Sequence, residues 1–445
     1  MKKQETIRKT GAFIRNSATV KVISIGVLVL VLLIPMSMIS SLMREREYRR
    51  DDVVREINAK WGNSQTLTGP FFTVPYKSFY RDKDDERLKY TLRYLHFLPE
   101  KVTIHGRLAP QIRYRSLYEA VLYTAEMEIN GDFELPVLAQ SNIDPQHVLW
   151  EKAVFSMGLT DMRGIQDKIT VTFGDREYKA SPGLNTTDIA ASGVKCAIPL
   201  SPGMDGTHFS LRIKLNGSEE IHFIPVGETT QVTLASSWPS PSFNGAFLPA
   251  EREVTGEGFT AGWTVLHLNR NFPQFWAGNQ YKVGDAAFGL KLLITADIYQ
   301  KSMRLSKYAV MFIVFTFSAF FFSEILTKKR VHPIQYLLIG LAVLLFYVLL
   351  LSLSEHLTFD LAYLLSASAV TVLITGYSRG ILRNNQFSLT VFGILAILYA
   401  YLYIVLQLED YALIMGSVGL FLALTGVMYM SRQIDWYALE RDENQ

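Results

Sequence analysis

The stretch IQYLLIGLAVLLFYVLLLSL, residues 334–353, decides the fold class of this chain. Its 20 residues contain no charged side chain. A helix rises about 1.5 Å per residue, so this stretch is long enough to cross the hydrocarbon core of a bilayer, which is about 30 Å thick. The sequence therefore predicts a membrane protein.

Five further apolar stretches predict further membrane-spanning helices. One stands alone near the N-terminus, and the others lie with residues 334–353 in the last third of the chain. The N-terminal stretch is longer than the roughly 7–15-residue core of a cleaved signal peptide, so we interpret it as an uncleaved signal anchor. The six predicted spans are residues 22–43, 308–326, 334–353, 361–377, 387–408 and 411–430.

The short connections between these spans predict how the chain is threaded through the membrane. Lysine and arginine are enriched in the cytoplasmic connections of membrane proteins. Basic residues dominate the tail 1–21 and recur at residues 328–330, at Arg379 and at Arg383, whereas the intervening connections are acidic. We therefore predict six spans, with both termini, including the tail 431–445, in the cytoplasm.

The segment between the first two spans, residues 44–307, is predicted to be one external domain. Apolar residues at helical spacing indicate that residues 44–62 continue the first helix as a stalk. Over residues 65–300 the apolar residues alternate, for example at Leu88, Tyr90 and Leu92, as in strands with one face on a core. We expect an all-β, sandwich-like antiparallel structure, with division into two lobes as an open alternative.

Three two-residue turns are expected to close β-hairpins in this domain. Asn130-Gly131 and Asn216-Gly217 each interrupt an alternating pattern. Asn-Gly supplies the two residues of positive φ that a type I′ turn requires. Gly174-Asp175 separates a third pair of alternating segments. These positions predict three hairpins.

A segment rich in proline, residues 236–263, contains four large aromatic side chains. Rigid loops display aromatic faces at a low cost in conformational entropy, so the segment is a candidate partner-binding loop. The alternative is a long connection whose aromatic side chains cap the core of the sheet. The candidate binding residues are Trp238, Phe243, Phe247 and Trp263.

The predicted spans contain few polar residues that suggest chemistry. Glu324 is the one acid within them, and carboxylates inside a membrane are functional candidates. Lys328 lies at helical spacing from it and offers a structural explanation. Glu355, His356 and Asp360 follow the third span at its predicted outer end. The candidate polar residues of the helical bundle are therefore Glu324, Glu355, His356 and Asp360.

The last predicted span carries a stripe of small residues. Small residues at spacings of three and four share one helix face and let helix backbones approach closely. We therefore expect this face to pack against a neighbouring helix. The stripe comprises Ala412, Gly416, Gly419, Ala423 and Gly426.

The composition argues against several classes of function. The formal net charge is only +3, and basic residues gather beside the spans, so nucleic acid is not a predicted partner. The single cysteine, Cys196, has apolar neighbours that favour burial over reactivity. The sequence contains no phosphate-binding loop, zinc-protease helix, nucleophile elbow or paired cysteine ligands. We predict no catalytic residue, no metal site and no cofactor.

Several segments resemble the CreD family of bacterial inner-membrane proteins, and together they extend over essentially the whole chain. The segments are SKYAVMFIVFTFSAFFFSEILTKKRVHPIQYLLIGLAVLLFYVLLLSLSEH (306–356), WPSPSFNGAFLPAEREV (238–254), GPFFTVPY (69–76), LTDMRGI (159–165) and IDWY (434–437). The resemblance implies a place in the Gram-negative inner membrane and a role in envelope integrity, stress response and colicin tolerance. It implies no molecular activity and no catalytic residues.

Two functions remain open at this point. The leading hypothesis is a non-enzymatic envelope protein whose periplasmic β domain binds an envelope protein or peptidoglycan, while the spans anchor it in the lipid bilayer. The alternative is a carrier, or a protein that handles lipids or wall precursors, in which the helical bundle and its polar residues act. The sequence leaves the partner and the oligomeric state open.

Overall fold

A computed structural model describes residues 18–81, 88–134, 143–201, 206–294, 298–327, 331–382, 385–408 and 412–432. The chain divides into two units. The membrane unit comprises Met1–Arg50 and Ala296–Gln445, and the β unit comprises Asp51–Thr295. The predicted basic connections at 328–330 and Arg383, and most of both predicted tails, lie outside the described residues.

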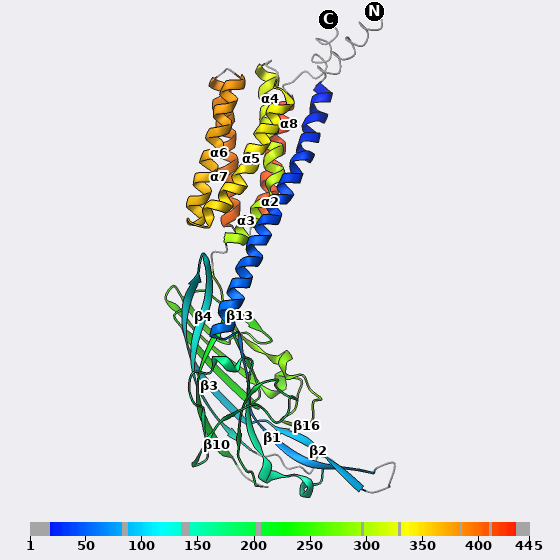
Figure 1. The fold of residues 1–445 in the computed structure, drawn as a ribbon, viewed down its shortest axis with the longest axis vertical. Coiled ribbons are helices and arrows are strands. Elements are labelled where there is room, and N and C mark those ends of the chain that lie inside the picture. The colour runs from blue at the N-terminus through cyan, green and yellow to red at the C-terminus, as the bar shows by residue number, and fades with distance from the viewer. Residues whose placement is uncertain are drawn as a thin grey trace, which may run out of the picture. The chain divides into compact units, whose positions relative to one another are not determined.

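The helices follow the predicted apolar stretches (Figure 1). Helix α2 is a single helix of 44 residues that begins in the membrane unit and ends in the β unit. In the membrane unit α5 packs on α6 and α6 packs on α7. The helices are α2 (Ala18–Trp61), α3 (Ile298–Lys307), α4 (Ala309–Thr327), α5 (Pro333–Ser354), α6 (Phe359–Leu382), α7 (Asn385–Gln407) and α8 (Ala412–Arg432).

Four of the described helices, α2, α5, α6 and α7, are long and apolar enough to cross a membrane. A fifth span is formed if the pair α3 and α4, bent by 48°, counts as one crossing. Helix α8 contributes a shorter apolar segment, Ile414–Tyr429. The predicted spans in α2, α5, α6 and α7 are thus present as helices, and the total of six stays a prediction.

The bend before α4 was not expected from the sequence. The pattern predicts that the external domain ends at Lys307 and that the second span begins at residue 308. Instead, α3 already forms a helix over the preceding ten residues. Its basic residues Lys301, Arg304 and Lys307 favour the interface over hydrocarbon, so the chain turns before it enters the apolar part of α4.

The strands of the β unit form a nine-stranded and an eight-stranded sheet. In the first, the order is β13-β17-β11-β1-β5-β9-β8, with β2 paired to β1 and β16 paired to β2; in the second it is β14-β15-β12-β3-β4-β10-β6-β7. The strands are β1 (Gln65–Arg81), β2 (Leu88–Phe97), β3 (Lys101–Arg115), β4 (Tyr118–Phe133), β5 (Val154–Leu159), β6 (Thr170–Phe173), β7 (Arg176–Lys179), β8 (Ser181–Pro182), β9 (Gly193–Ala197), β10 (Thr207–Ser218), β11 (Glu220–Ile224), β12 (Thr229–Ser236), β13 (Pro241–Gly245), β14 (Glu251–Thr255), β15 (Gly258–Leu266), β16 (Phe275–Ala277) and β17 (Phe288–Leu292).

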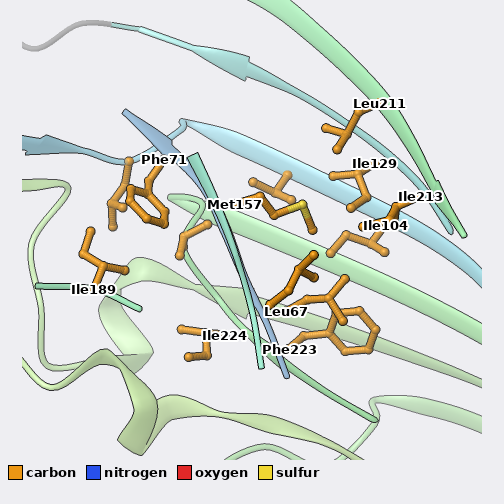
Figure 2. Close-up of a cluster of buried hydrophobic side chains, with 14 of the residues drawn as sticks. Leu67, Phe71, Ile104, Ile129, Met157, Ile189, Leu211, Ile213, Phe223 and Ile224 are labelled. Carbon is orange, nitrogen blue, oxygen red and sulfur yellow. The ribbon is translucent and has the colours of Figure 1, made fainter. Parts of the chain in front are cut away.

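The two sheets enclose one hydrophobic core. Figure 2 shows Leu67 and Met157 of the nine-stranded sheet gathered with Ile104 and Ile129 of the eight-stranded sheet. The buried apolar residues of both sheets belong to one continuous cluster. The β unit is therefore a large sandwich-like structure with a single core, and the alternative of two lobes is wrong.

The sheets are mixed and not purely antiparallel as predicted. Strand β1 pairs in parallel with β11, and β3 pairs in parallel with β12. Parallel neighbours require a long connection between them, because a two-residue turn joins only antiparallel strands. The alternating pattern identifies strands but carries no information about such long-range pairing.

Only one of the three predicted hairpins is present. Gly174-Asp175 joins β6 to β7, where Phe173 pairs with Arg176 and Gly174 has a φ of 58°. Asn130-Gly131 instead lies inside β4, which pairs with β3 on one side and β10 on the other. The hairpin prediction at 130–131 is therefore wrong.

Gly131 is required for close approach and not for a turn. A Cβ atom at this position would lie 2.6 Å from the Phe209 ring and still closer to the Lys101 carbonyl oxygen. A larger residue would force the neighbouring strands apart. The same dipeptide that is typical of a turn thus occurs here because two strands and an aromatic ring crowd one point.

The hairpin predicted at Asn216-Gly217 is also wrong. These residues end β10, and the chain then passes through Glu219, with a φ of 58°, into β11 of the other sheet. A Cβ atom at Gly217 would overlap the Tyr123 ring. Asn216 accepts hydrogen bonds from the Thr124 hydroxyl at 2.9 Å and, through its main-chain oxygen, from Gln65 at 3.1 Å. These contacts fix the change of sheet.

We expect Gly131→Ala to destabilise the full chain in detergent by about 1–3 kcal/mol, because the added methyl group overpacks the site. Asn130→Thr should have little effect, since a strand tolerates a β-branched residue that a type I′ turn does not. Gly262→Ala, in a strand where the nearest atom to the Cβ position is the Glu251 carbonyl oxygen at 4.0 Å, is the matched control. Thermal unfolding followed by tryptophan fluorescence checks all three. A large loss of stability in Asn130→Thr would contradict the strand assignment and support a turn at this position.

Candidate functional site

Glu324 lies near the end of α4 and is buried, with 7% of its surface exposed. It forms an ion pair with Lys21 at the start of α2. It also accepts hydrogen bonds from the Tyr336 hydroxyl at 3.1 Å and from the Val331 main-chain N–H at 3.0 Å. Lys328, the partner considered from the sequence, lies outside the described residues. The carboxylate thus connects α2, α4 and the start of α5.

The other three polar candidates lie together at the opposite end of α5. Glu355 pairs with Arg46 of α2 at 3.0 Å. Asp360, in the first turn of α6, accepts hydrogen bonds from Tyr403 at 3.0 Å and Gln407 at 3.1 Å. His356 is exposed. The structure therefore separates Glu324 from the other three by the length of α5, and both groups of carboxylates make contacts within the membrane unit.

The small-residue stripe of α8 packs over only part of its length. Gly419 lies against the Tyr401 ring of α7, whose hydroxyl donates to the Met415 carbonyl. A Cβ atom at Gly416 would lie 3.7 Å from the Tyr308 ring. Gly426 is exposed, with no described atom near its Cβ position. The side chains of Ala412 and Ala423 lie outside the described residues.

The four aromatic candidates of the β unit pack against the core. Trp263 of β15 is only 2% exposed, and its ring lies 5.8 Å from both Phe243 and Phe288. Phe247 also contacts Phe288, at 6.0 Å. The Trp238 indole N–H donates to the Leu293 carbonyl at 3.1 Å. The expectation that Trp263 is displayed to a partner is wrong, because its side chain faces the core. Trp238, Phe243 and Phe247 are half-buried and cover the edge of the core.

The structure exposes a different aromatic surface, which we call the β1–β2 arm. It consists of residues 77–81 and 88–93, the outer parts of two paired strands (Figure 1). Among the described strands, only β2 pairs with this part of β1, because the pairing with β5 ends at Thr73. The arm therefore extends beyond the sheet, and no strand in the described part of the chain pairs with the outer edge of either of its two segments.

One face of the arm carries four apolar or aromatic side chains with two cationic ones at its margins. The register places Phe79 opposite Tyr90 and Lys77 opposite Leu92. The Phe79 and Tyr90 rings are 5.8 Å apart, and the Lys77 ammonium lies 5.3 Å from the Tyr90 ring centre. Leu88, Tyr90 and Leu92 are 66%, 53% and 52% exposed. The alternating pattern correctly predicted this strand, but its apolar face does not lie on the core.

A hydroxyl, an imidazole and a carboxylate lie in a row inside the β unit. The Thr73 hydroxyl is 3.2 Å from His96 Nδ1, and His96 Nε2 is 3.0 Å from an Asp188 carboxylate oxygen. Thr73 and His96 are buried, so the hydroxyl cannot reach a substrate. Burial lowers the pKa of His96, and Asp188 opposes this effect. The row is consistent with a neutral imidazole that joins β1 and β2 to the segment before β9.

Among the described residues, no group of three or more histidine, cysteine or acidic side chains is placed to hold a metal ion. His208 bonds to Asp132 at 3.0 Å on one sheet, and His222 bonds to Asn244 at 2.8 Å on the other. Cys196 is buried in β9, and burial raises the pKa of its thiol to about 11. A thiol with this pKa stays protonated and is a poor nucleophile at neutral pH.

Comparisons with known proteins concern both units. A family described as "Inner membrane protein CreD" matches residues 17–437. The inner membrane protein CreD of Escherichia coli (strain K12) is 32% identical over 418 residues, which cover 92% of each chain. The similarity thus includes α2, the whole β unit and all the described helices of the membrane unit.

The His96 row predicts a specific pH dependence of stability. Because the pKa of His96 is lowered in the folded state, the unfolded chain binds the proton first as the pH falls below about 6.5. The stabilisation that depends on a neutral His96 is therefore present above that pH. It is lost below that pH, by at most about 1.4 kcal/mol per pH unit. His96→Gln should reduce the loss in melting temperature between pH 7.5 and 5.5. His208→Gln, at an exposed histidine outside this row, is the control substitution. Equal pH dependence in wild type and His96→Gln would refute the assignment.

The Lys21–Glu324 contact predicts energetic coupling between α2 and α4. Lys21→Met and Glu324→Gln should each lower the melting temperature in detergent, because each leaves the other charge of the pair without its oppositely charged partner. The double variant should lose less than the sum of the two, with a coupling of about 0.5–3 kcal/mol. Arg49→Gln, in an exposed ion pair of α2 with Glu45, is the control. Strict additivity would mean that the pair contributes nothing.

Proposed function

This chain belongs to the CreD family of inner membrane proteins, and from that premise we propose that it is a non-enzymatic envelope protein whose β unit binds a partner in the periplasm. The apolar helices support anchorage in the inner membrane. The positive charges beside the spans support a threading with six crossings and both termini in the cytoplasm. The β unit is then the part that is available to other envelope components.

The β1–β2 arm is the observation that carries this proposal. Leu88, Tyr90 and Leu92 present more than half of their surface to solvent on one face. Contiguous exposed apolar side chains of this kind are typical of interaction sites, because burying them against a partner is favourable. A folded chain would gain stability by burying this face in its own core, so its exposure favours a role in binding.

The chemistry of the arm favours a protein partner over a glycan. No described strand pairs with its outer backbone edges, and an extended segment of another protein can add to such an edge by main-chain hydrogen bonds. The aliphatic side chains of Leu88 and Leu92 suit apolar side chains of that segment better than sugar hydroxyls. Lys77 and Arg81 lie on the same face and favour an acidic segment. We therefore propose an envelope protein, and peptidoglycan is the alternative partner.

The carrier hypothesis has less support. Glu324, Glu355 and Asp360, which would act at the two ends of a pathway, are engaged in ion pairs and hydrogen bonds within the membrane unit. These contacts support roles in holding the helices together. We therefore place the binding function in the β unit.

The arm predicts a separation of folding from function. Leu88→Ser/Tyr90→Ser/Leu92→Ser should leave the melting temperature of the purified chain nearly unchanged, because the three side chains are exposed. It should nevertheless fail to restore envelope integrity in a strain that lacks the protein. Leu248→Ser/Leu268→Ser, at positions 67% and 79% exposed elsewhere in the β unit, is the matched control and should restore it.

Two outcomes would change the proposal. Full restoration by the arm variant would show that the arm is not the binding surface. Binding of purified peptidoglycan by the wild-type chain, lost in the arm variant and kept in the control, would assign the arm to the wall instead of to a protein.

A further inference from the structure

The hairpin formed by β3 and β4 projects beyond the eight-stranded sheet. Strand β12 pairs with β3 only as far as Leu108, and β10 pairs with β4 only as far as Leu122. Among the described strands, residues 112–121 therefore pair only with one another. We call these residues the β3–β4 tip. At about 3.3 Å per residue, the tip extends about 15 Å past the sheet.

The tip carries three exposed apolar side chains. Ile112, Tyr114 and Leu117 are 40%, 65% and 45% exposed. Ile112 and Tyr114 share one face of the strand because they are two residues apart. Leu117 and Ser116, which has a φ of 57°, form the two-residue turn at the end. Apolar side chains that gather at a protruding turn are typical of an interaction surface.

Two arginine side chains of the tip contact α2. The Arg113 guanidinium lies 4.2 Å from the Trp61 ring centre, and Arg115 forms an ion pair with Glu56. As the hairpin runs outward from Arg113 to Arg115, its partners run back along α2 from Trp61 to Glu56. The tip therefore points toward the N-terminal part of α2, which contains the predicted span 22–43.

Both connections of the β unit leave it at the base of the tip, where Glu219 bonds to three segments. The Glu219 carboxylate accepts from the Asn58 amide of α2 at 2.8 Å. The Glu219 N–H donates to the Val121 carbonyl of β4 at 3.1 Å, and the Glu219 carbonyl accepts from the Leu292 N–H of β17 at 2.8 Å. The chain thus enters along α2 and leaves after β17 at one end of the unit, and the tip projects from that same end.

The two connections from this end to the membrane helices are short. Because Arg115 pairs with Glu56, the turn lies at about the level of Val53, and about 15 Å of helix separates that level from Met43 at the end of the predicted span. On the other side, the chain from Leu292 to the start of α3 covers at most about 22 Å.

These lengths place the tip within reach of the lipid headgroups. The headgroup layer fills roughly 5–8 Å outside the hydrocarbon core. Spans tilt by about 20°, and by up to about 40°, and a tilt lowers a feature beside the helix toward the membrane. The argument holds whichever way the chain is threaded, because it depends only on α2 as a span. By contrast, the β1–β2 arm projects from the opposite end of the β unit (Figure 1).

The side chains of the tip suit a lipid surface. Tyrosine is enriched at the headgroup level because its ring is apolar and its hydroxyl is polar. Leucine and isoleucine gain free energy when they leave water for the boundary of the acyl chains. Arg113 and Arg115 outnumber Glu119, so the tip carries a positive charge that favours lipid phosphate groups.

We propose that the β3–β4 tip is a second membrane contact of this protein. Tyr114 lies among the headgroups, and Ile112 and Leu117 enter the boundary of the acyl chains. Together with α2, the tip attaches the β unit to the bilayer at two points and directs the β1–β2 arm away from the lipid. This contact rests on α2 as a span and not on the partner proposed for the arm.

Fluorescence from a single dye tests the contact in the full chain. Cys196 is buried, so a cysteine introduced at an exposed position is labelled selectively. Leu117→Cys, labelled with nitrobenzoxadiazole in vesicles of phosphatidylethanolamine and phosphatidylglycerol, should be quenched by lipids with a nitroxide near the headgroup. The quenching should be several-fold stronger than at Leu92→Cys on the arm or at Leu248→Cys, which are 52% and 67% exposed. Tyr114→Cys gives a second reading if Leu117→Cys fails to fold.

The same measurement separates the alternatives. Quenching at the tip no stronger than at Leu92 would overturn the contact. A blue-shifted emission without lipid quenching would also overturn it, because the tip would then lie against protein. The arm variant Leu88→Ser/Tyr90→Ser/Leu92→Ser should leave the quenching at residue 117 unchanged, so the failure of this contact and the failure of the arm are measured separately.

Discussion

A polar group that enters the hydrocarbon core must find its partner inside the protein, and the membrane unit depends on this constraint. Two ion pairs obey it at the two ends of one apolar segment. Lys21 and Arg46 of α2, about 38 Å apart along the helix, pair with Glu324 and Glu355. The spacing slightly exceeds the thickness of the hydrocarbon core, so if α2 spans the membrane each pair lies at one edge of the core, where a charge without a partner is still unfavourable. The first span is thus attached to the others by ion pairs near its ends, and its middle contributes apolar contacts such as those of Leu32 and Met36.

The β unit contains no internal disulfide, because the chain has a single cysteine. Buried hydrogen bonds connect its segments instead. At the end of α2, the Asp161 carboxylate accepts from the Asn63 N–H and the Arg163 guanidinium, which hold the pKa of Asp161 at about 2. Gln65 bonds to the main chain of both Asp161 and Asn216. The segment LTDMRGI, which carries part of the family resemblance, therefore has a structural role: it joins β5, β10 and the helix end.

The sequence predicted features that depend on a pattern within one element. It did not predict features that depend on contacts between residues far apart in the chain. Apolar length located α5, α6 and α7, and alternation located most strands, because both patterns arise within one element. Asn-Gly failed at Gly131 and Gly217, since Phe209 and Tyr123, far away in the sequence, decide what those glycines do. The same limit applies to the candidate sites. Alternation showed that Leu88 and Leu92 share a face but not that this face is exposed, and composition could not show that Trp263 lies in the core.

The open edges of the β1–β2 arm also concern the amount of protein that a cell can carry. An unpaired strand edge is a template for any extended chain that meets it, including a second copy of the same arm. If the proposed partner covers these edges, a cell that makes this protein in excess over that partner would accumulate edges that can join to one another. Balanced supply of the two molecules would then become a condition of solubility.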